Sequence, residues 1–174
     1  MKERIAAIFG SGDAKQGDEV YEVACRTAEL LARAGFTIIN GGYGGIMLAS
    51  AKAAVTAGGE TIGVTCRAFG RGGANEYIKR EITTDTLDER LKTLIETADA
   101  YIVLPGSTGT LLELAKVWEL KNKGFIDKDK PFILVGDFWR PLIELIVEQN
   151  PGSRRYIRMA KGPAEVLEIL KDNI

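Results

Sequence analysis

The sequence predicts an α/β fold of the Rossmann-like type, a doubly wound sheet of mainly parallel strands with helices on both faces. Short runs such as residues 4–9 and 36–40 are predominantly apolar and carry apolar residues on both faces, which is typical of parallel strands buried on both sides. Segments with helical periodicity alternate with these runs, and glycine-rich turns such as residues 41–45 join them. We expect one domain over residues 1–174, because this length is enough for a full core.

The first half of the chain shows the alternation most clearly. Residues 4–9 predict the first strand. A helix is expected from about Asp18, and Gly35 is its predicted end because glycine commonly follows the last helical turn. The remaining predicted elements of this half are a strand at 36–40, an Ala-rich helix at 46–57 and a strand at 60–65.

The second half begins with residues 66–77, which contain three glycines and no periodicity and predict a mobile surface loop. A helix is expected over 86–98, with an apolar stripe of Leu87, Leu91, Leu94, Ile95 and Ala98. A strand at 101–104 then runs into a glycine turn and a Leu-rich helix. The remaining predicted elements are strands at 79–84, 131–136 and 156–160 and helices at 141–148 and 164–170.

The composition limits the chemistry that the chain can perform. A hydrophobic content of 45% and a net charge of −1 are typical of a soluble globular protein and predict no nucleic-acid partner. No apolar run reaches the roughly 18 residues that span a membrane, so we expect no membrane partner and a cytoplasmic location. The chain has no histidine, and Cys25 and Cys66 alone cannot hold zinc. We therefore expect no metal and no cofactor, and chemistry based on carboxylates, cations, hydroxyls or backbone dipoles.

The sharpest functional signal is the stretch 101–120, where a buried strand, a glycine turn and a helix start follow one another. Such a turn leaves backbone N–H groups unpaired, and the helix dipole favours an anion there. The predicted phosphate-binding residues of this turn are Pro105, Gly106, Ser107, Thr108, Gly109 and Thr110. Glu113, expected in the first helical turn, places a carboxylate close to that phosphate. The alternatives are a tight turn without a ligand and a Glu that only stabilises the helix dipole.

Two further glycine loops follow predicted strands. The candidate ligand-binding residues are Gly10, Ser11 and Gly12 after the first strand and Gly41, Gly42, Gly44, Gly45 and Met47 after the second. Ligands of open α/β sheets collect at the carboxyl ends of the strands, so we expect these loops to share the ligand of the third. For the second loop alone, a purely structural role is as well supported as ligand contact.

Three arginines are candidates for the same site. Arg90 lies at the edge of the apolar stripe of the helix at 86–98, where long side chains also rest with their charge in water. Arg67 and Arg71 belong to the loop at 66–77; they are either ordinary loop arginines or residues that cover a phosphate.

The helix after the third glycine turn predicts a subunit contact. One face is expected to carry Leu111, Leu114, Ala115 and Trp118, and nearly the opposite face Val117, Leu120 and Glu113. A helix with two apolar faces is buried on both. We therefore expect one face to cover the sheet and the other to meet a second copy of the protein, giving a homodimer or a higher oligomer with Glu113 near the boundary.

Several segments resemble the LOG ("Lonely guy") family, long labelled putative lysine decarboxylases. They are GGYGGIM, the run from DERLK through PGSTGTLLE, DKDKPFILVGDFWRPLIE and the C-terminal strand and helix. The similarity covers nearly the whole chain, and it implies a Rossmann-like fold and a dimer. Many members of this family are cytokinin riboside 5′-monophosphate phosphoribohydrolases.

The resemblance implies hydrolysis of the N-glycosidic bond of a nucleoside 5′-monophosphate, with Glu113 and Arg90 as catalytic residues. Active members commonly have Met-His-Glu-Arg-Lys around that arginine and a second glycine where this chain has Ser107. Here the segment reads Leu87-Asp88-Glu89-Arg90-Leu91. Related molybdenum-cofactor carriers share the fold and bind a phosphorylated pterin without this hydrolysis. The alternative is therefore a non-catalytic protein that binds a nucleotide or another phosphorylated cofactor. A pyridoxal lysine decarboxylase is rejected, because such enzymes usually stack a histidine on the cofactor.

Overall fold

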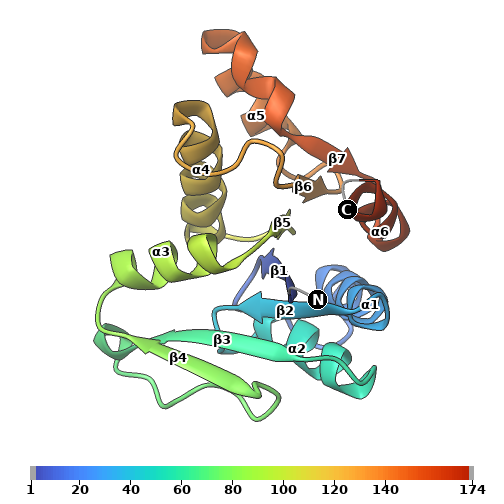
Figure 1. Ribbon diagram of the computed structural model, residues 1–174, viewed down its shortest axis with the longest axis vertical. Coiled ribbons are helices and arrows are strands. Elements are labelled where there is room, and N and C mark those ends of the chain that lie inside the picture. Colours follow the sequence, from blue (N-terminus) through green and yellow to red (C-terminus); the bar gives the residue numbers. More distant parts are fainter. Residues whose placement is uncertain (1–2, 173–174) are drawn as a thin grey trace.

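The structure, a computed structural model, describes residues 3–172 and contains one parallel sheet in the order β4-β3-β2-β1-β5-β6-β7 (Figure 1). Its strands are β1 Arg4–Phe9, β2 Phe36–Asn40, β3 Thr61–Cys66, β4 Arg80–Thr84, β5 Ala100–Val103, β6 Phe132–Val135 and β7 Arg158–Ala160. Its helices are α1 Glu19–Arg33, α2 Ile46–Thr56, α3 Leu87–Thr97, α4 Thr108–Lys123, α5 Arg140–Gln149 and α6 Pro163–Lys171. The α/β Rossmann-like prediction is confirmed, and every strand pair in the described sheet is parallel.

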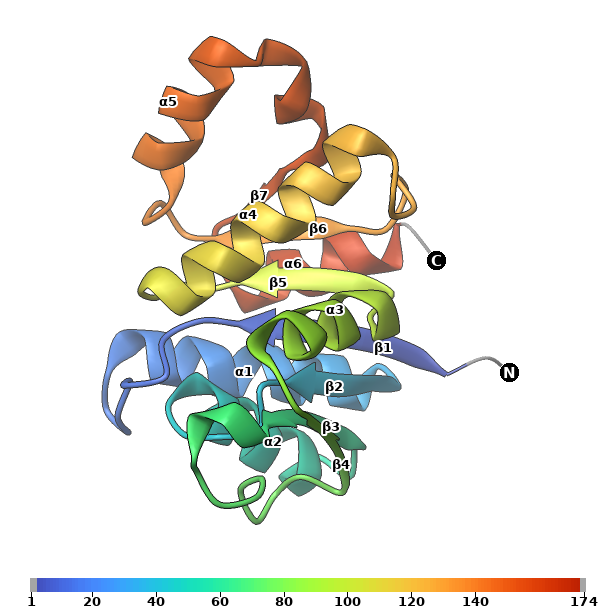
Figure 2. The same ribbon diagram turned by 90° about the vertical axis from the view of Figure 1, so that its left-hand side faces the viewer.

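The helices form one layer on each face of the sheet. Successive residues of a strand point to opposite faces, so Ile8 of β1 packs with α1, α2 and α6, whereas Phe9 packs with α3, α4 and α5. The two views agree with these clusters: α1 and α6 lie on one side of the sheet, and α3 and α4 on the other (Figures 1 and 2). Both faces are therefore buried, which explains why the central strands carry apolar residues on both faces.

The strand order reverses beside β1. The chain moves outward from β1 through β2 and β3 to β4 and then returns to place β5 on the other side of β1. Ligand sites of open α/β sheets form at such a switch point, outside the carboxyl ends of the strands. The loops after β1, β2 and β5 all emerge at that edge.

Helix α4 differs from its prediction in two ways. It begins at Thr108, so Thr108 to Thr110 form its first turn and Glu113 lies in the second turn, not the first. Val117 packs in the same cluster as Leu114 and Trp118, and not on the opposite face. Residues at spacings of three and four share one side of a helix, so a single buried stripe accounts for these side chains. The prediction of a second buried face is therefore wrong for Val117, and Ala115, expected to cover the sheet, is exposed.

The loop after β3 and the start of α3 also depart from expectation. The loop contains a short 3-10 turn, η1 (Arg67–Phe69), and a second such turn, η2 (Pro151–Tyr156), precedes β7. Leu87, predicted in the apolar stripe of α3, is 42% exposed because it occupies the first helical position, beyond the edge of the core. None of the described helices is long and apolar enough to cross a membrane.

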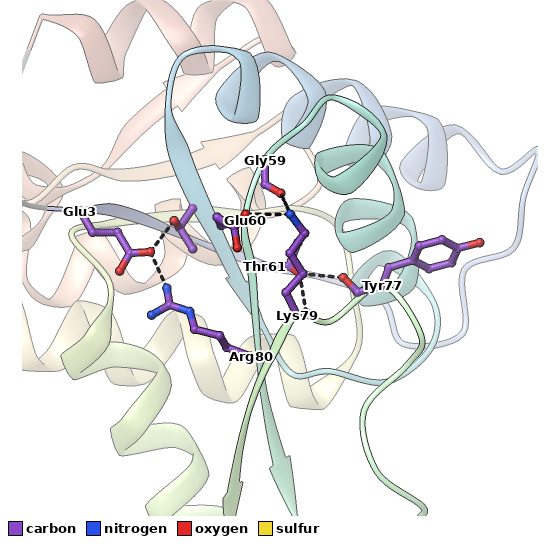
Figure 3. A network of polar contacts seen from close by, with 8 residues as sticks. Glu3, Gly59, Glu60, Thr61, Tyr77, Lys79 and Arg80 are labelled. Atoms are coloured by element: carbon purple, nitrogen blue, oxygen red, sulfur yellow. Dashed lines mark hydrogen bonds and ion pairs between the residues drawn. The ribbon is translucent and has the colours of Figure 1, made fainter.

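A network of hydrogen bonds and ion pairs connects residues near the amino ends of β1 to β4 (Figure 3). Glu3 accepts a hydrogen bond from the Thr37 hydroxyl at 2.7 Å and forms an ion pair with Arg80. Lys79 donates to the Glu60 carboxylate at 2.7 Å. At this edge, these charged groups lie at the starts of different strands and pair with one another.

Candidate active site

A cavity of about 320 Å³ opens at the carboxyl edge of the sheet, beside the switch point. Its walls come from the loops after β1 and β2, the η1 segment, α3 and the first two turns of α4. The lining residues are Ile8, Phe9, Gly10, Gly12, Asp13, Gly41, Tyr43, Met47, Phe69, Arg71, Leu87, Arg90, Leu91, Ser107, Gly109, Thr110, Leu112 and Glu113. Some of the predicted residues from each of the three glycine loops thus meet at one site with Arg90 and Glu113.

The three glycine loops are tied to one another by their backbones. The Ser11 amide donates to the Pro105 carbonyl at 3.0 Å, and the Ile46 amide donates to the Ser11 carbonyl at 2.9 Å. Gly45 has a positive φ of 61°, and a Cβ there would lie 2.3 Å from the Ser11 oxygen. The loops approach so closely that no side chain fits between them.

Seven of the predicted ligand-binding residues lie outside the lining of the cavity: Ser11, Gly42, Gly44, Gly45, Pro105, Gly106 and Thr108. Several of them pack the loops instead. A Cβ on Gly106 would lie 2.1 Å from the Thr110 hydroxyl oxygen, and Gly42, with φ of 80°, packs against Thr65. Much of the glycine pattern is therefore explained by loop packing around the site.

The amino end of α4 is open toward solvent and the cavity. Ser107 is the N-cap residue, and its side chain makes no capping hydrogen bond. Ser107, Thr108 and Gly109 are exposed, and no acidic residue occupies the first turn. First-turn amides have no partner within their own helix, so these N–H groups and the helix dipole present a positive end to an anion.

Arg90 is held rigidly within the wall of the cavity. Its side chain is buried, with Nε donating to the Val64 carbonyl at 2.7 Å and Nη2 to the Gly41 carbonyl at 3.0 Å. Burial lowers the pKa of Arg90, and the nearby Glu113 carboxylate opposes that change. An arginine remains protonated at neutral pH even so, which makes Arg90 a fixed positive charge.

Glu113 combines enclosure with access to the cavity. Burial raises the pKa of Glu113 to about 7, and the positive charge of Arg90 partly opposes this shift. Over residues 3–172, the Glu113 side chain forms no ion pair and no hydrogen bond. Every buried side-chain oxygen and nitrogen in the described residues has a hydrogen-bond partner. Because the Glu113 oxygens have none, they are not fully buried and are accessible from the cavity. A carboxylate with this pKa can accept or release a proton near neutral pH.

The far end of the cavity is aromatic and cationic, and little in the sequence indicated it. The rings of Tyr43 and Phe69 are 6.0 Å apart, and the Tyr43 hydroxyl accepts a hydrogen bond from the Cys66 amide at 2.8 Å. The guanidinium of Arg71 lies 5.2 Å from the Tyr43 ring. Sequence reasoning missed Asp13, Tyr43, Phe69 and Leu87 as site residues. An aromatic residue inside the GGYGG turn was the one available signal.

The described residues contain no cluster of three or more His, Cys, Asp or Glu side chains that could hold a metal ion. The sequence profile of the SLOG cluster4 family matches residues 3–152, which is most of the chain. The chain belongs to this family.

Named relatives of this SLOG cluster4 protein include phosphoribohydrolases. It is 37% identical over 124 residues to the cytokinin riboside 5′-monophosphate phosphoribohydrolase of Mycobacterium tuberculosis, covering 70% of this chain. The match covers 64% of the mycobacterial protein, slightly under two thirds of its length. A probable enzyme of the same name from Oryza sativa is 29% identical over 186 residues, covering 97% of this chain and 72% of the rice protein.

Solved structures with the same fold include molybdenum-cofactor proteins. The molybdenum cofactor binding protein of Rippkaea orientalis has a TM-score of 0.79 and 25% identity, covering 99% of this chain and 98% of the other. The molybdenum cofactor carrier protein of Chlamydomonas reinhardtii has a TM-score of 0.78 at 22% identity over the same shares, which supports the fold alone.

Proposed function

We propose that the protein is a nucleoside 5′-monophosphate phosphoribohydrolase, an N-glycosidase that releases the base and ribose 5-phosphate. One observation carries the proposal: an uncapped helix amino end, a carboxylate with a raised pKa and a buried arginine face one cavity. The named phosphoribohydrolase relatives add support.

In this proposal, the 5′-phosphate binds at the amino end of α4, near Ser107, Gly109 and Thr110. Gly12 allows the backbone after β1 to approach the ligand closely, because it has no side chain, whereas Gly10 leaves room for Ile46 and Leu104. Glu113 comes six residues after Ser107, which places it about 9 Å further along the helix axis. A ligand whose phosphate is fixed at the helix end therefore extends its sugar toward Glu113.

Glu113 acts as the general base at the anomeric carbon. The C1′–N bond breaks and its electron pair leaves with the base, while a water oxygen bonds to C1′ and gives a proton to the Glu113 carboxylate. The sugar is oxocarbenium-like at the transition state, and the negative carboxylate stabilises it. Arg90 keeps part of the Glu113 population ionised at neutral pH. Binding the remote phosphate positions the sugar for this step.

A second candidate is a non-catalytic protein that binds or carries a phosphorylated cofactor. The favouring observation is the similarity to the Rippkaea orientalis cofactor binding protein, which extends over 99% of this chain. The helix amino end and glycine loops would hold the phosphate of such a ligand equally well, whereas the raised pKa of Glu113 would have no role in it.

The self-association expected from the sequence remains a proposal. The two-faced arrangement of α4 does not support it, because Val117 is already buried within the chain. Exposed apolar side chains after α4 and on α5 support self-association instead, since Phe125 is 75% and Leu145 61% exposed. Light scattering on the purified protein measures the oligomeric state directly.

The deciding experiment incubates the protein with AMP and with N6-substituted AMP and measures free base. The wild type should release base, and Glu113→Gln should release it about a thousandfold more slowly, because the general base is removed. Glu119→Gln is the matched control, since Glu119 lies exposed on the same helix and pairs with Lys123. No release by the wild type, together with stoichiometric binding of a phosphorylated pterin, would favour the carrier instead.

A further inference from the structure

The cavity has two chemically different ends, and the strand order fixes their positions. The amino end of α4 follows β5 on one side of β1, whereas the η1 segment follows β3, two strands away on the other side. Arg90 lies toward the second end, because its guanidinium bonds the Val64 carbonyl of β3 and the Gly41 carbonyl after β2. A nucleotide with its phosphate at α4 therefore directs its base toward Tyr43, Phe69 and Arg71.

Arg71 is free to contact a ligand at that end. Within residues 3–172 its side chain makes no hydrogen bond or ion pair, and its guanidinium lies 5.2 Å from the ring of Tyr43 and 5.8 Å from that of Phe69. Arg67, in the same loop after β3, instead forms an ion pair with Asp85 and does not line the cavity. All five N–H donors of Arg71 therefore remain available.

Two guanidinium groups share this aromatic pair. The Arg90 guanidinium lies 5.6 Å from the ring of Tyr43 and 5.4 Å from that of Phe69, so it and Arg71 both lie within 6 Å of the same two rings. Asp13 and Glu113 are the acidic residues among the lining. Like charges held near one another repel, and negative charge arriving between them is stabilised. This end of the cavity thus favours a group that becomes negative.

We infer that the leaving base occupies the end formed by Tyr43, Phe69 and Arg71, and that Arg71 is a catalytic residue that stabilises the departing base. The inference rests on the proposed function. When the C1′–N bond breaks, the electron pair passes to the ring nitrogen of the base, and Arg71 donates hydrogen bonds to its acceptor atoms. Arg71 keeps its own protons; the base takes its proton afterwards, from Glu113 or from water. The chain has no histidine that could act as an imidazole acid.

The test compares Arg71→Gln with its matched control Arg67→Gln on two substrates. AMP loses its base as an anion, whereas an N7-methylated purine nucleotide loses a neutral base that needs no such stabilisation. With AMP, Arg71→Gln should lower kcat about a hundredfold, which is typical of removing one donor to developing charge. With the N7-methylated substrate, kcat should remain close to that of the wild type. Arg67→Gln should match the wild type on both substrates.

The outcomes separate this inference from the proposed function. If the wild type releases base but Arg71→Gln slows both substrates equally, Arg71 has a structural role and the inference is overturned. The inference is also overturned if kcat is unchanged and only KM rises, because Arg71 then binds the ground state. If the wild type releases no base from either substrate, the proposed function fails and the inference fails with it.

Discussion

The charged residues near the amino ends of β1 to β4 and those lining the cavity at the carboxyl edge are used differently. At the amino edge, Lys79 donates to Glu60 and Arg80 pairs with Glu3, so both of these cations have an acidic partner (Figure 3). At the carboxyl edge, Arg71 and Glu113 have no such partner among the described residues, and Arg90 bonds only to protein carbonyls and the Met47 sulfur. These groups at the amino edge are paired within the protein, whereas the cavity at the carboxyl edge leaves Arg71 and Glu113 available to a ligand.

This difference indicates where the chain gives up stability for function. Exposed ion pairs such as those of the amino edge each contribute about 0–1 kcal/mol. At the carboxyl edge, Glu113 is enclosed without a compensating hydrogen bond, which disfavours its charged form. Substitutions at the carboxyl edge should therefore change activity strongly, and substitutions at the amino edge should change stability slightly.

The largest effect is expected from Arg90→Met. Base release should fall about a thousandfold, because the fixed charge beside the reacting sugar and Glu113 is lost. The acid limb of the pH profile should also move to higher pH, since Arg90 lowers the pKa of Glu113. Lys92→Met is the control, an exposed position on the same helix. If the rate stays within a few-fold of the wild type and the acid limb does not move, Arg90 has no role in catalysis.

Gly45→Ala should have the next largest effect, on stability. The added Cβ would lie 2.3 Å from the Ser11 oxygen, and φ is positive, so the loops after β1 and β2 must separate. We expect the free energy of unfolding in urea to fall by about 3 kcal/mol. Gly17→Ala measures the cost of the positive φ alone, because φ is 96° there but nothing lies within 4 Å of the added carbon. Equal losses in the two variants would show that the loops do not need their close contact.

A smaller effect is expected in the pH dependence of stability. The pKa of Glu113 rises from its ordinary value of 4.5 to about 7 on folding, so between these values the folded state binds a proton that the unfolded state has lost. This contribution is fully present at low pH and is lost as the pH rises through about 7, a change of about 2 kcal/mol after allowance for solvent in the cavity. Urea unfolding near pH 5 and near pH 8 should show the loss in the wild type relative to Glu113→Gln. Parallel curves for the two proteins would contradict it.

The sequence predicted the fold closely because its signals are local. Buried parallel strands such as β1 and β2 carry apolar residues on both faces, and the predicted bounds of these two strands match the structure. Parallel strands bring their carboxyl ends to one edge, which is why the sequence predicts the glycine loops and Glu113 at one site. The role of Arg90 beside Glu113 came instead from the resemblance to the LOG family.

The missed features depend on contacts between distant segments. Phe69 and Arg71 come from a segment without periodicity, so nothing local places them over Tyr43. Val117 was placed on a separate face because a helical wheel shows the direction in which each side chain points, but not how much of the helix circumference the neighbouring elements bury. The buried part of the circumference is fixed by tertiary packing. For α4 this packing includes η2, since the Trp118 indole donates to the Ser153 carbonyl at 3.1 Å.

The smallest effect is expected at the amino edge, from Lys79→Met. The variant loses hydrogen bonds to the Gly59 carbonyl at 2.8 Å and the Glu60 carboxylate at 2.7 Å, both of which are exposed to water. The free energy of unfolding should fall by less than about 1 kcal/mol, because water replaces both partners. Base release should be unchanged, since this edge is at the opposite end of the strands from the cavity. A change in kcat as large as that of Arg71→Gln would mean that the two edges are coupled through the sheet, and their division into a stabilising edge and a functional edge would fail.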